Sequence, residues 1–164
     1  MTEAAVLTPH IQAAAEIAAW RGRCIDVFAK GERAVGQVLE LANAKDGSIK
    51  IRHLAGQRMA DVEEIVDKMT ATASQQQAAR DAIGNWKDAE NKRAFIAHGI
   101  STPLLDRNGY WYVHLDFVAY RGSRCEARRW SVSGSEAVEF EASLTEAFKG
   151  LATQLGQVRK RFAA

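Results

Sequence analysis

The chain has 164 residues, which is the size of one ordinary globular domain. Apolar residues make up 47% and charged residues 26% of it, a composition that argues against a disordered chain. Lysine and arginine number 22 against 20 acidic residues, so the net charge of +2 neither requires nor excludes a nucleic-acid partner. We predict a single domain spanning residues 1–164.

The sequence predicts neither a disulfide framework nor a metal site or other cofactor. Two cysteines, Cys24 and Cys125, indicate reduced thiols, with a single bridge between them as the alternative. The four histidines lack the spacing of metal ligands: His10, His53, His98 and His114. Residues 1–8 lack a signal-peptide pattern, and no apolar run approaches the roughly 20 residues that cross a bilayer. We therefore expect a cytoplasmic protein without a membrane anchor.

Helical periodicity dominates the first hundred residues. Thr8 followed by Pro9 is typical of a helix start, and apolar spacing continues the helix to about residue 42. Residues 49–52 have the pattern of a brief strand, and residues 56–70 that of a second helix. Ser74 is the predicted N-cap of a third helix over residues 75–98. Trp20 and Trp86 fall on apolar helix faces, so we expect them in the core or at a dimer contact.

The period changes from helical to alternating near Gly109. Residues 110–120 alternate between apolar and polar positions, and residues 125–132 form a second alternating run. An antiparallel hairpin of two strands, or three, is therefore expected over about residues 109–132. Before it, Gly99 is expected to end the third helix and Pro103 to keep it from resuming.

A capping-box pattern, Ser143-Leu144-Thr145-Glu146, predicts the start of the last helix. The expected fold class is α+β, mainly α. It is a four-helix bundle with the hairpin inserted between the third and fourth long helices.

The polar end of the third helix carries two residues suited to phosphodiester chemistry. Arginine can hold and neutralise a phosphate, and histidine can move a proton near neutral pH. Arg93 and His98 are five residues apart, so on a helix they diverge by about 140° and rise about 7.5 Å. The structural alternative is that His98 only hydrogen-bonds carbonyls at the helix end and Arg93 pairs with Glu90.

The segment Arg93-Ala94-Phe95-Ile96-Ala97-His98-Gly99 resembles the R-x4-6-H signature of the HEPN superfamily (higher eukaryote and prokaryote nucleotide-binding domains). The motif covers about seven residues, and the helical layout compatible with that family covers most of the chain. The resemblance implies a metal-independent ribonuclease of toxin or defence type. In such enzymes the RNA 2′-hydroxyl attacks the adjacent phosphate, and Arg93 and His98 would be the catalytic residues.

The resemblance also implies a homodimer with the site at its two-fold interface, and an antitoxin or nucleotidyltransferase partner. Small residues on the first helix suit a close helix contact: Ala18, Gly22, Gly31 and Ala34. Ala94 departs from the family, in which a polar residue, commonly asparagine, follows the arginine. A non-enzymatic helical homodimer with a structural or interaction role is therefore the alternative function.

The hairpin is the most basic and aromatic surface that the sequence predicts. Arg124, Arg128 and Arg129 are its candidate RNA-binding residues, because single-stranded RNA is held by phosphate contacts and base stacking. Four aromatic residues accompany them: Trp111, Tyr112, Tyr120 and Trp130. The alternative places the tryptophans in the core and pairs the arginines with Asp116, Glu126 and Glu136.

Overall fold

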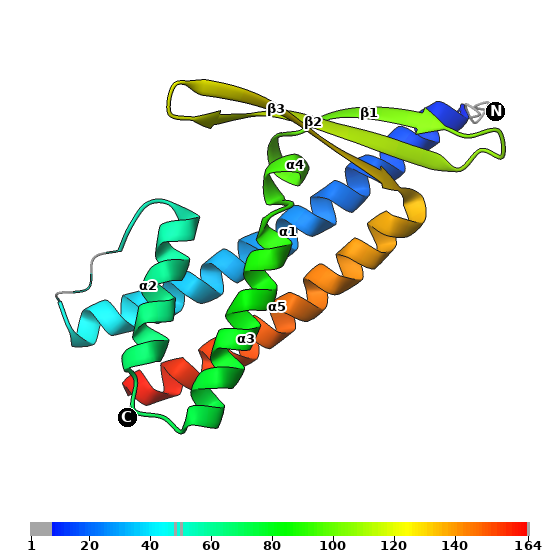
Figure 1. Cartoon of the computed structure of the whole chain (residues 1–164). Helices are drawn as coiled ribbons and strands as arrows, with labels where there is room; N and C mark the ends of the chain where they lie inside the picture. Colours follow the sequence, from blue (N-terminus) through cyan, green and yellow to red (C-terminus); the bar gives the residue numbers. More distant parts are fainter. Residues whose placement is uncertain (1–7, 48, 50, 164) are drawn as a thin grey trace, which may run out of the picture. The chain divides into compact units, whose positions relative to one another are not determined.

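The computed structural model describes residues 8–47, 49 and 51–163, and this part of the chain is mainly helical with one antiparallel sheet (Figure 1). The expectation for the N-terminal segment falls almost wholly outside the described residues. So do Ser48 and Lys50 of the expected turn and brief strand. The described residues of that expected strand, Ile49 and Ile51 among them, are not in a strand.

The chain forms five helices and three strands within its described residues. In chain order they are α1 (Pro9–Lys45), α2 (Ala55–Lys68), α3 (Ala73–Glu90), α4 (Arg93–His98), β1 (Ile100–Leu105), β2 (Trp111–Arg121), β3 (Arg124–Ser133) and α5 (Gly134–Ala163). They divide into two compact units, residues 1–25 with 92–142 and residues 26–91 with 143–164. Helices α1 and α5 each contribute a segment to both units.

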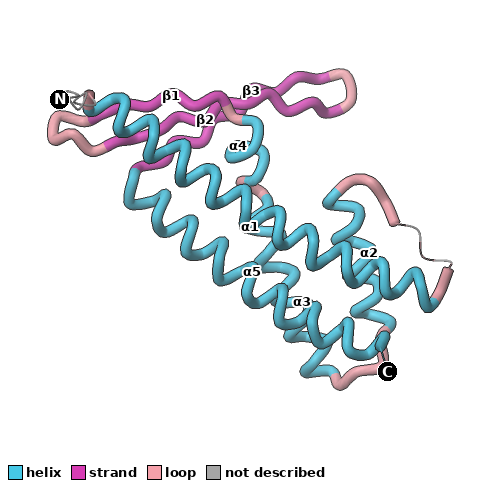
Figure 2. The backbone as a smooth tube through the Cα atoms, turned by 180° about the vertical axis from the view of Figure 1, so that it is seen from behind, coloured by secondary structure: helices cyan, strands magenta, loops and turns pink. Residues whose placement is uncertain are grey.

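The first unit contains the sheet, whose strand order is β1-β2-β3 with antiparallel neighbours. Strand β2 alternates as predicted: Val113 and Leu115 are buried, whereas Tyr112 and Tyr120 on the opposite face are exposed. β1 pairs only with the first half of β2, so the far part of the β2–β3 hairpin is a two-stranded ribbon (Figures 1 and 2).

Strand β1 lies outside the hairpin range predicted from the sequence, at residues 109–132. From the sequence, Pro103 is expected only to prevent the third helix from resuming. In the structure it pairs with Val113 across the sheet. A proline cannot donate a ladder hydrogen bond, so it is tolerated in an edge strand such as β1. The structure therefore realises the three-stranded version of the sheet.

The second unit consists of helices and loops within its described residues, drawn from α1, α2, α3 and α5 (Figure 2). Trp86 of α3 is fully buried and meets Phe28 of α1 and Phe148 of α5 edge-on, with ring centroids 5.8 and 6.4 Å apart. Gly31 allows this packing, since a Cβ atom there would overlap the Trp86 ring. Trp86 is thus a core residue, which is one of the two positions expected for it.

The single third helix predicted over residues 75–98 is wrong, because the chain forms two helices there. The backbone leaves regular helix geometry at Lys92 (φ −94°, ψ −9°), and α4 follows as a separate six-residue helix. The predicted N-cap is also displaced: Thr72, not Ser74, accepts the N–H of Gln75, and the Gln75 side chain accepts the N–H of Thr72.

The predicted start of the last helix at Ser143 is wrong as well. Helix α5 begins ten residues earlier, where Ser133 and Glu136 form the same serine-to-glutamate capping box. The Ser133 hydroxyl accepts the N–H of Glu136 at 3.2 Å, and the Glu136 carboxylate accepts the N–H of Ser133 at 2.8 Å. The backbone N–H of Ser133 and its hydroxyl, which also donates to the carboxylate at 2.7 Å, lower the pKa of Glu136.

Candidate functional site

Helix α4 carries both candidate catalytic residues and is anchored by its buried middle. The Phe95 ring packs edge-on against Phe117 of β2, with centroids 4.7 Å apart, and Ile96 is 1% exposed. The ammonium group of Lys92 lies 5.0 Å from the Trp130 ring centre, a cation–π distance. α4 is therefore fixed against the sheet although it is too short to be stable alone.

Arg21 of α1 closes the C-terminal end of α4. Its guanidinium donates to the Ile96 carbonyl oxygen at 2.7 and 3.0 Å and to the Gly99 carbonyl oxygen at 2.9 Å. The carbonyls at a helix end lack intrahelical partners, and a forked guanidinium is suited to satisfy two of them. Arg21 is half-buried, so this contact is partly shielded from water.

His98 is left exposed at the end of the helix that Arg21 closes. Within the described residues, no hydrogen bond or ion pair involves the His98 side chain. The structural alternative for His98, a carbonyl contact at the helix end, is not realised, because Arg21 occupies that role. The imidazole therefore faces solvent with both ring nitrogens available.

Arg93 lies at the opposite end of α4, at its first position, and is half-buried. The structure thus places Arg93 and His98 on one short helix but at different ends of it, as their spacing requires. A substrate that contacts both residues would have to lie along this short helix. Ala94, the departure from the family motif, is half-buried beside Arg93.

Gly99 ends α4 for a reason that differs from the prediction. Its backbone is extended (φ −65°, ψ 132°), which other residues also adopt, so no left-handed conformation is needed. A Cβ atom at Gly99 would instead overlap the carbonyl oxygen of Phe95 and approach Leu115 of β2. Glycine is required here mainly because a side chain would overlap the Phe95 carbonyl of α4 itself, and the close approach of β2 leaves little further space.

The three candidate RNA-binding arginines do not form one cluster. Arg129 donates to the Asp116 carboxylate at 2.7 and 3.0 Å, and Arg128 donates to Glu126 at 2.8 Å. The Arg129 guanidinium lowers the pKa of Asp116. Strand alternation puts Arg129 on one face and Arg124 and Arg128 on the other. Two of the three arginines therefore pair with sheet carboxylates, as the structural alternative expected, whereas Glu136 caps α5.

The aromatic residues of the sheet divide between its two faces. Trp111 and Trp130 are half-buried and approach Trp20, with ring centroids 6.5 and 6.1 Å from it. Tyr112 and Tyr120 are 42% and 77% exposed on the opposite face, the face of Arg129. The tyrosines, rather than the tryptophans, are the aromatic rings that a partner could reach.

Sequence reasoning missed Arg21, although the sequence carries a signal for it. Arg21 is four positions after Ile17 and borders the buried stripe of α1, where an arginine needs polar partners. The two cysteines are both free. Cys24 is buried, and the loss of hydration raises the pKa of its thiol to about 12, whereas Cys125 is exposed.

Comparison of the chain with protein-family models, with curated protein sequences and with solved structures found no match. Among the described residues, no helix combines the length and the apolar character that a membrane span requires. In the same part of the chain, no group of three or more His, Cys, Asp or Glu side chains could hold a metal ion.

Proposed function

We propose that the protein is a HEPN-like endoribonuclease that cleaves RNA without a metal ion, with His98 and Arg93 as its catalytic residues. The observation that carries the proposal is the exposed His98 on a helix end that Arg21 already satisfies. A histidine that makes no stabilising contact and follows an arginine by five residues fits the family motif. The order of elements, with a sheet before the last helix, is compatible with the layout expected for that family, but the motif lies on the separate helix α4 and not at the end of the third helix.

The proposed reaction uses the nucleophile that RNA itself supplies. The 2′-hydroxyl oxygen attacks the adjacent phosphorus, the P–O5′ bond breaks, and the products are a 2′,3′-cyclic phosphate and a 5′-hydroxyl end. His98 accepts the proton that the attacking 2′-hydroxyl releases and returns a proton to the departing 5′-oxygen, because imidazole gains and loses protons near neutral pH. Arg93 neutralises the phosphate charge, which increases in the transition state.

RNA contacts beyond α4 are proposed for the sheet. Arg124 is exposed at the start of β3, beside the turn, and Tyr120 is exposed near the same turn but on the opposite face of the ribbon. An exposed ring and a guanidinium are the groups that stack on bases and contact phosphates. Arg128 and Arg129 would contribute only by exchanging their carboxylate partners for phosphate, at small cost for exposed pairs.

Cleavage of mixed RNA by the purified protein in excess EDTA tests the proposal. His98→Ala is expected to lower the cleavage rate by a factor on the order of 10² to 10⁴, the effect of losing a general acid–base group. His53→Ala is the matched control, because His53 is also exposed but lies in the loop before α2. Since both side chains are exposed, circular dichroism should be unchanged in both variants.

The outcomes separate the two functions considered for this chain. Cleavage that requires added metal, or that His98→Ala leaves unchanged, would contradict the proposed mechanism. RNA binding without cleavage would indicate a non-catalytic HEPN-like protein. This would be consistent with Ala94, which stands where the family motif has a polar residue. The absence of both would favour the alternative of an interaction protein.

A further inference from the structure

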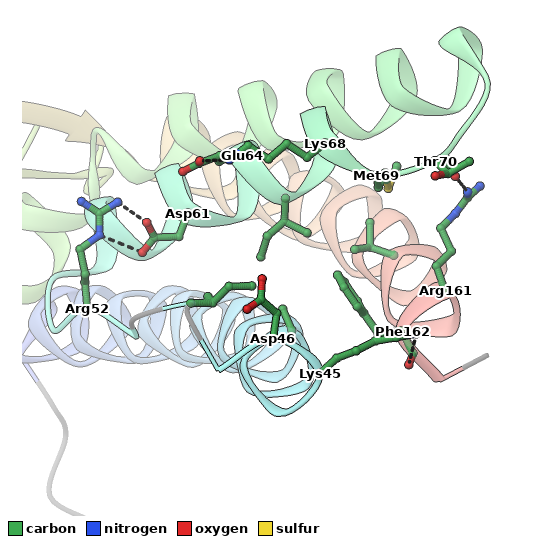
Figure 3. Close-up of a pocket in the computed structure, with 14 residues that line it drawn as sticks. Lys45, Asp46, Arg52, Asp61, Glu64, Lys68, Met69, Thr70, Arg161 and Phe162 are labelled. Atoms are coloured by element: carbon green, nitrogen blue, oxygen red, sulfur yellow. Dashed lines mark hydrogen bonds and ion pairs between the residues drawn. The ribbon is translucent and has the colours of Figure 1, made fainter.

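A cavity of about 900 Å³ lies in the second unit, and we propose that it binds an uncharged, largely apolar small molecule. Its volume is in the range of small-molecule sites, about 300–1,000 Å³. The larger apolar residues of its lining are Ile49, Ile65, Met69, Val158 and Phe162. These residues come from the loop after α1, from α2 and the residue after it, and from the end of α5 (Figure 3).

Other parts of the protein cover only some of the apolar residues of α2, and apolar residues left partly uncovered line the cavity. Met59, Val62 and Val66 of this face are buried, between 0% and 2% exposed. Ile65 and Met69 belong to the same apolar periodicity but remain half-buried, and both line the cavity. Apolar side chains that face a water-filled space gain free energy when an apolar molecule displaces the water.

The ionic groups around the cavity have partners within the protein. Arg52 donates to the Asp61 carboxylate, with one contact at 2.9 Å, and Lys68 pairs with Glu64 (Figure 3). Asp46 also has an interaction partner. A charged ligand would therefore have to compete with existing pairs.

The two remaining basic residues of the lining donate to uncharged oxygens. Arg161 contacts the Thr70 carbonyl oxygen and, at 2.7 Å, the Gln75 side-chain oxygen (Figure 3). The ammonium group of Lys45 lies 3.5 Å from the Phe162 carbonyl oxygen. Because neither residue contacts a negatively charged side chain, other groups must balance the positive charges of Arg161 and Lys45.

Three helix ends supply that balance. α1 ends at Lys45, α2 ends at Lys68 and α5 ends at Ala163, and each contributes a residue of its last turn to the lining. A helix C-terminus carries roughly half a negative elementary charge. The lining has four basic and three acidic side chains, an excess of one positive charge, which these helix ends offset.

The cavity thus offers apolar contact together with a nearly neutral electrostatic environment. A carboxylate or an ammonium group entering it would lose hydration without meeting an uncompensated opposite charge, and this is unfavourable. An uncharged apolar molecule loses little favourable hydration when it enters the cavity. The ligand class follows from this difference, and the inference is independent of the proposed ribonuclease activity, whose residues belong to the other unit.

The neutral fluorophore N-phenyl-1-naphthylamine can be used to test the proposal with the full-length protein. We expect saturable binding, and displacement by 1-octanol at concentrations at least about tenfold lower than by octanoate or octylammonium at neutral pH. The three competitors have the same alkyl chain and differ in head-group charge. The comparison therefore reports the electrostatic selectivity of the site.

Two variants locate the binding site. Ile65→Glu places a charge on the apolar lining and Met69→Trp fills the space without charge, and each should weaken binding of the fluorophore by about tenfold or more. Leu41→Glu is the matched control, because Leu41 is exposed on α1 and does not line the cavity. Non-saturable binding, unchanged binding by both cavity variants, or octanoate that competes as well as octanol would overturn the proposal.

Discussion

Arg21 decides which groups of α4 remain available for chemistry. Its three hydrogen bonds to Ile96 and Gly99 fix the carbonyl end of the helix and leave His98 in solvent. In the proposed enzyme Arg21 is a positioning residue, since it acts through the orientation of α4.

Arg21→Ala should destabilise the protein by about 1–3 kcal/mol, because two partly buried carbonyl groups lose their donor. Urea denaturation measures this loss, and hydrogen exchange should show faster exchange of the Gly99 N–H at the α4 end. Arg23→Ala is the control: Arg23 forms an exposed ion pair with Glu141, worth less than about 1 kcal/mol. Equal losses for the two variants would contradict the role assigned to Arg21.

Among the elements, α5 contains the serine-to-glutamate capping pattern twice, but only one copy begins a helix. Ser133 and Ser143 are each followed three residues later by glutamate, and only the first pair caps a helix. Ser133 ends strand β3, so its backbone is already extended, as an N-cap requires. Ser143 lies inside the helix that Ser133 starts.

Ser133→Ala should cost about 1 kcal/mol of stability at neutral pH, the usual effect of losing an N-cap side chain. Ser143→Ala provides the matched control and should leave stability unchanged or slightly raised, since alanine is the better helix former. Urea denaturation of both variants is the measurement. A larger loss for Ser143→Ala would show that the helix begins where the sequence alone suggested.

The same capping box should make stability depend on pH. The pKa of Glu136 is lowered in the folded protein, so its contribution is present above the ordinary glutamate value of 4.5. It is lost as the pH falls through the lower folded value. The stability difference between the parent and Glu136→Gln should therefore shrink from pH 7 to pH 3, and an unchanged difference would contradict this linkage.

Elements with a long uniform period could be predicted from the sequence. α1 begins at Pro9 as its Thr8–Pro9 signal indicates, and β2 follows its alternation. The break at Lys92 and strand β1 could not be predicted, because both depend on packing between distant segments. The candidate site shows the same division: Arg93 and His98 were visible as a motif, whereas the contact of Arg21 with α4 joins residues 75 positions apart.

At the scale of the whole molecule, the exposed side of α1 is a surface suited to a second copy of the chain. Gly22 has open space where a side chain would stand, Ala18 is exposed, and Ile11 and Ile25 are 52% and 37% exposed. Gly31, also predicted for this contact, lies against Trp86 of its own chain. We propose that the homodimer forms through residues 11–25 of α1.

Gly22→Glu should convert the dimer to a monomer, because it places a bulky charge where two helices would approach closely. Light scattering at tens of micromolar protein measures the mass. Gly150→Glu is the control, since Gly150 is an exposed helical glycine of α5 with equally open space around it. A monomeric parent protein, or a dimer that persists in Gly22→Glu, would exclude this interface.

The distribution of tryptophans gives each unit its own optical reporter. Trp86 is the one tryptophan of the second unit, whereas Trp20, Trp111 and Trp130 all belong to the first. A chain that keeps only Trp86 would report the melting of the helical unit, and Trp86→Phe would report that of the sheet unit. Because α1 and α5 run without interruption through both, a comparison of the two melting curves measures how far a continuous helix transmits cooperativity from one hydrophobic core to another.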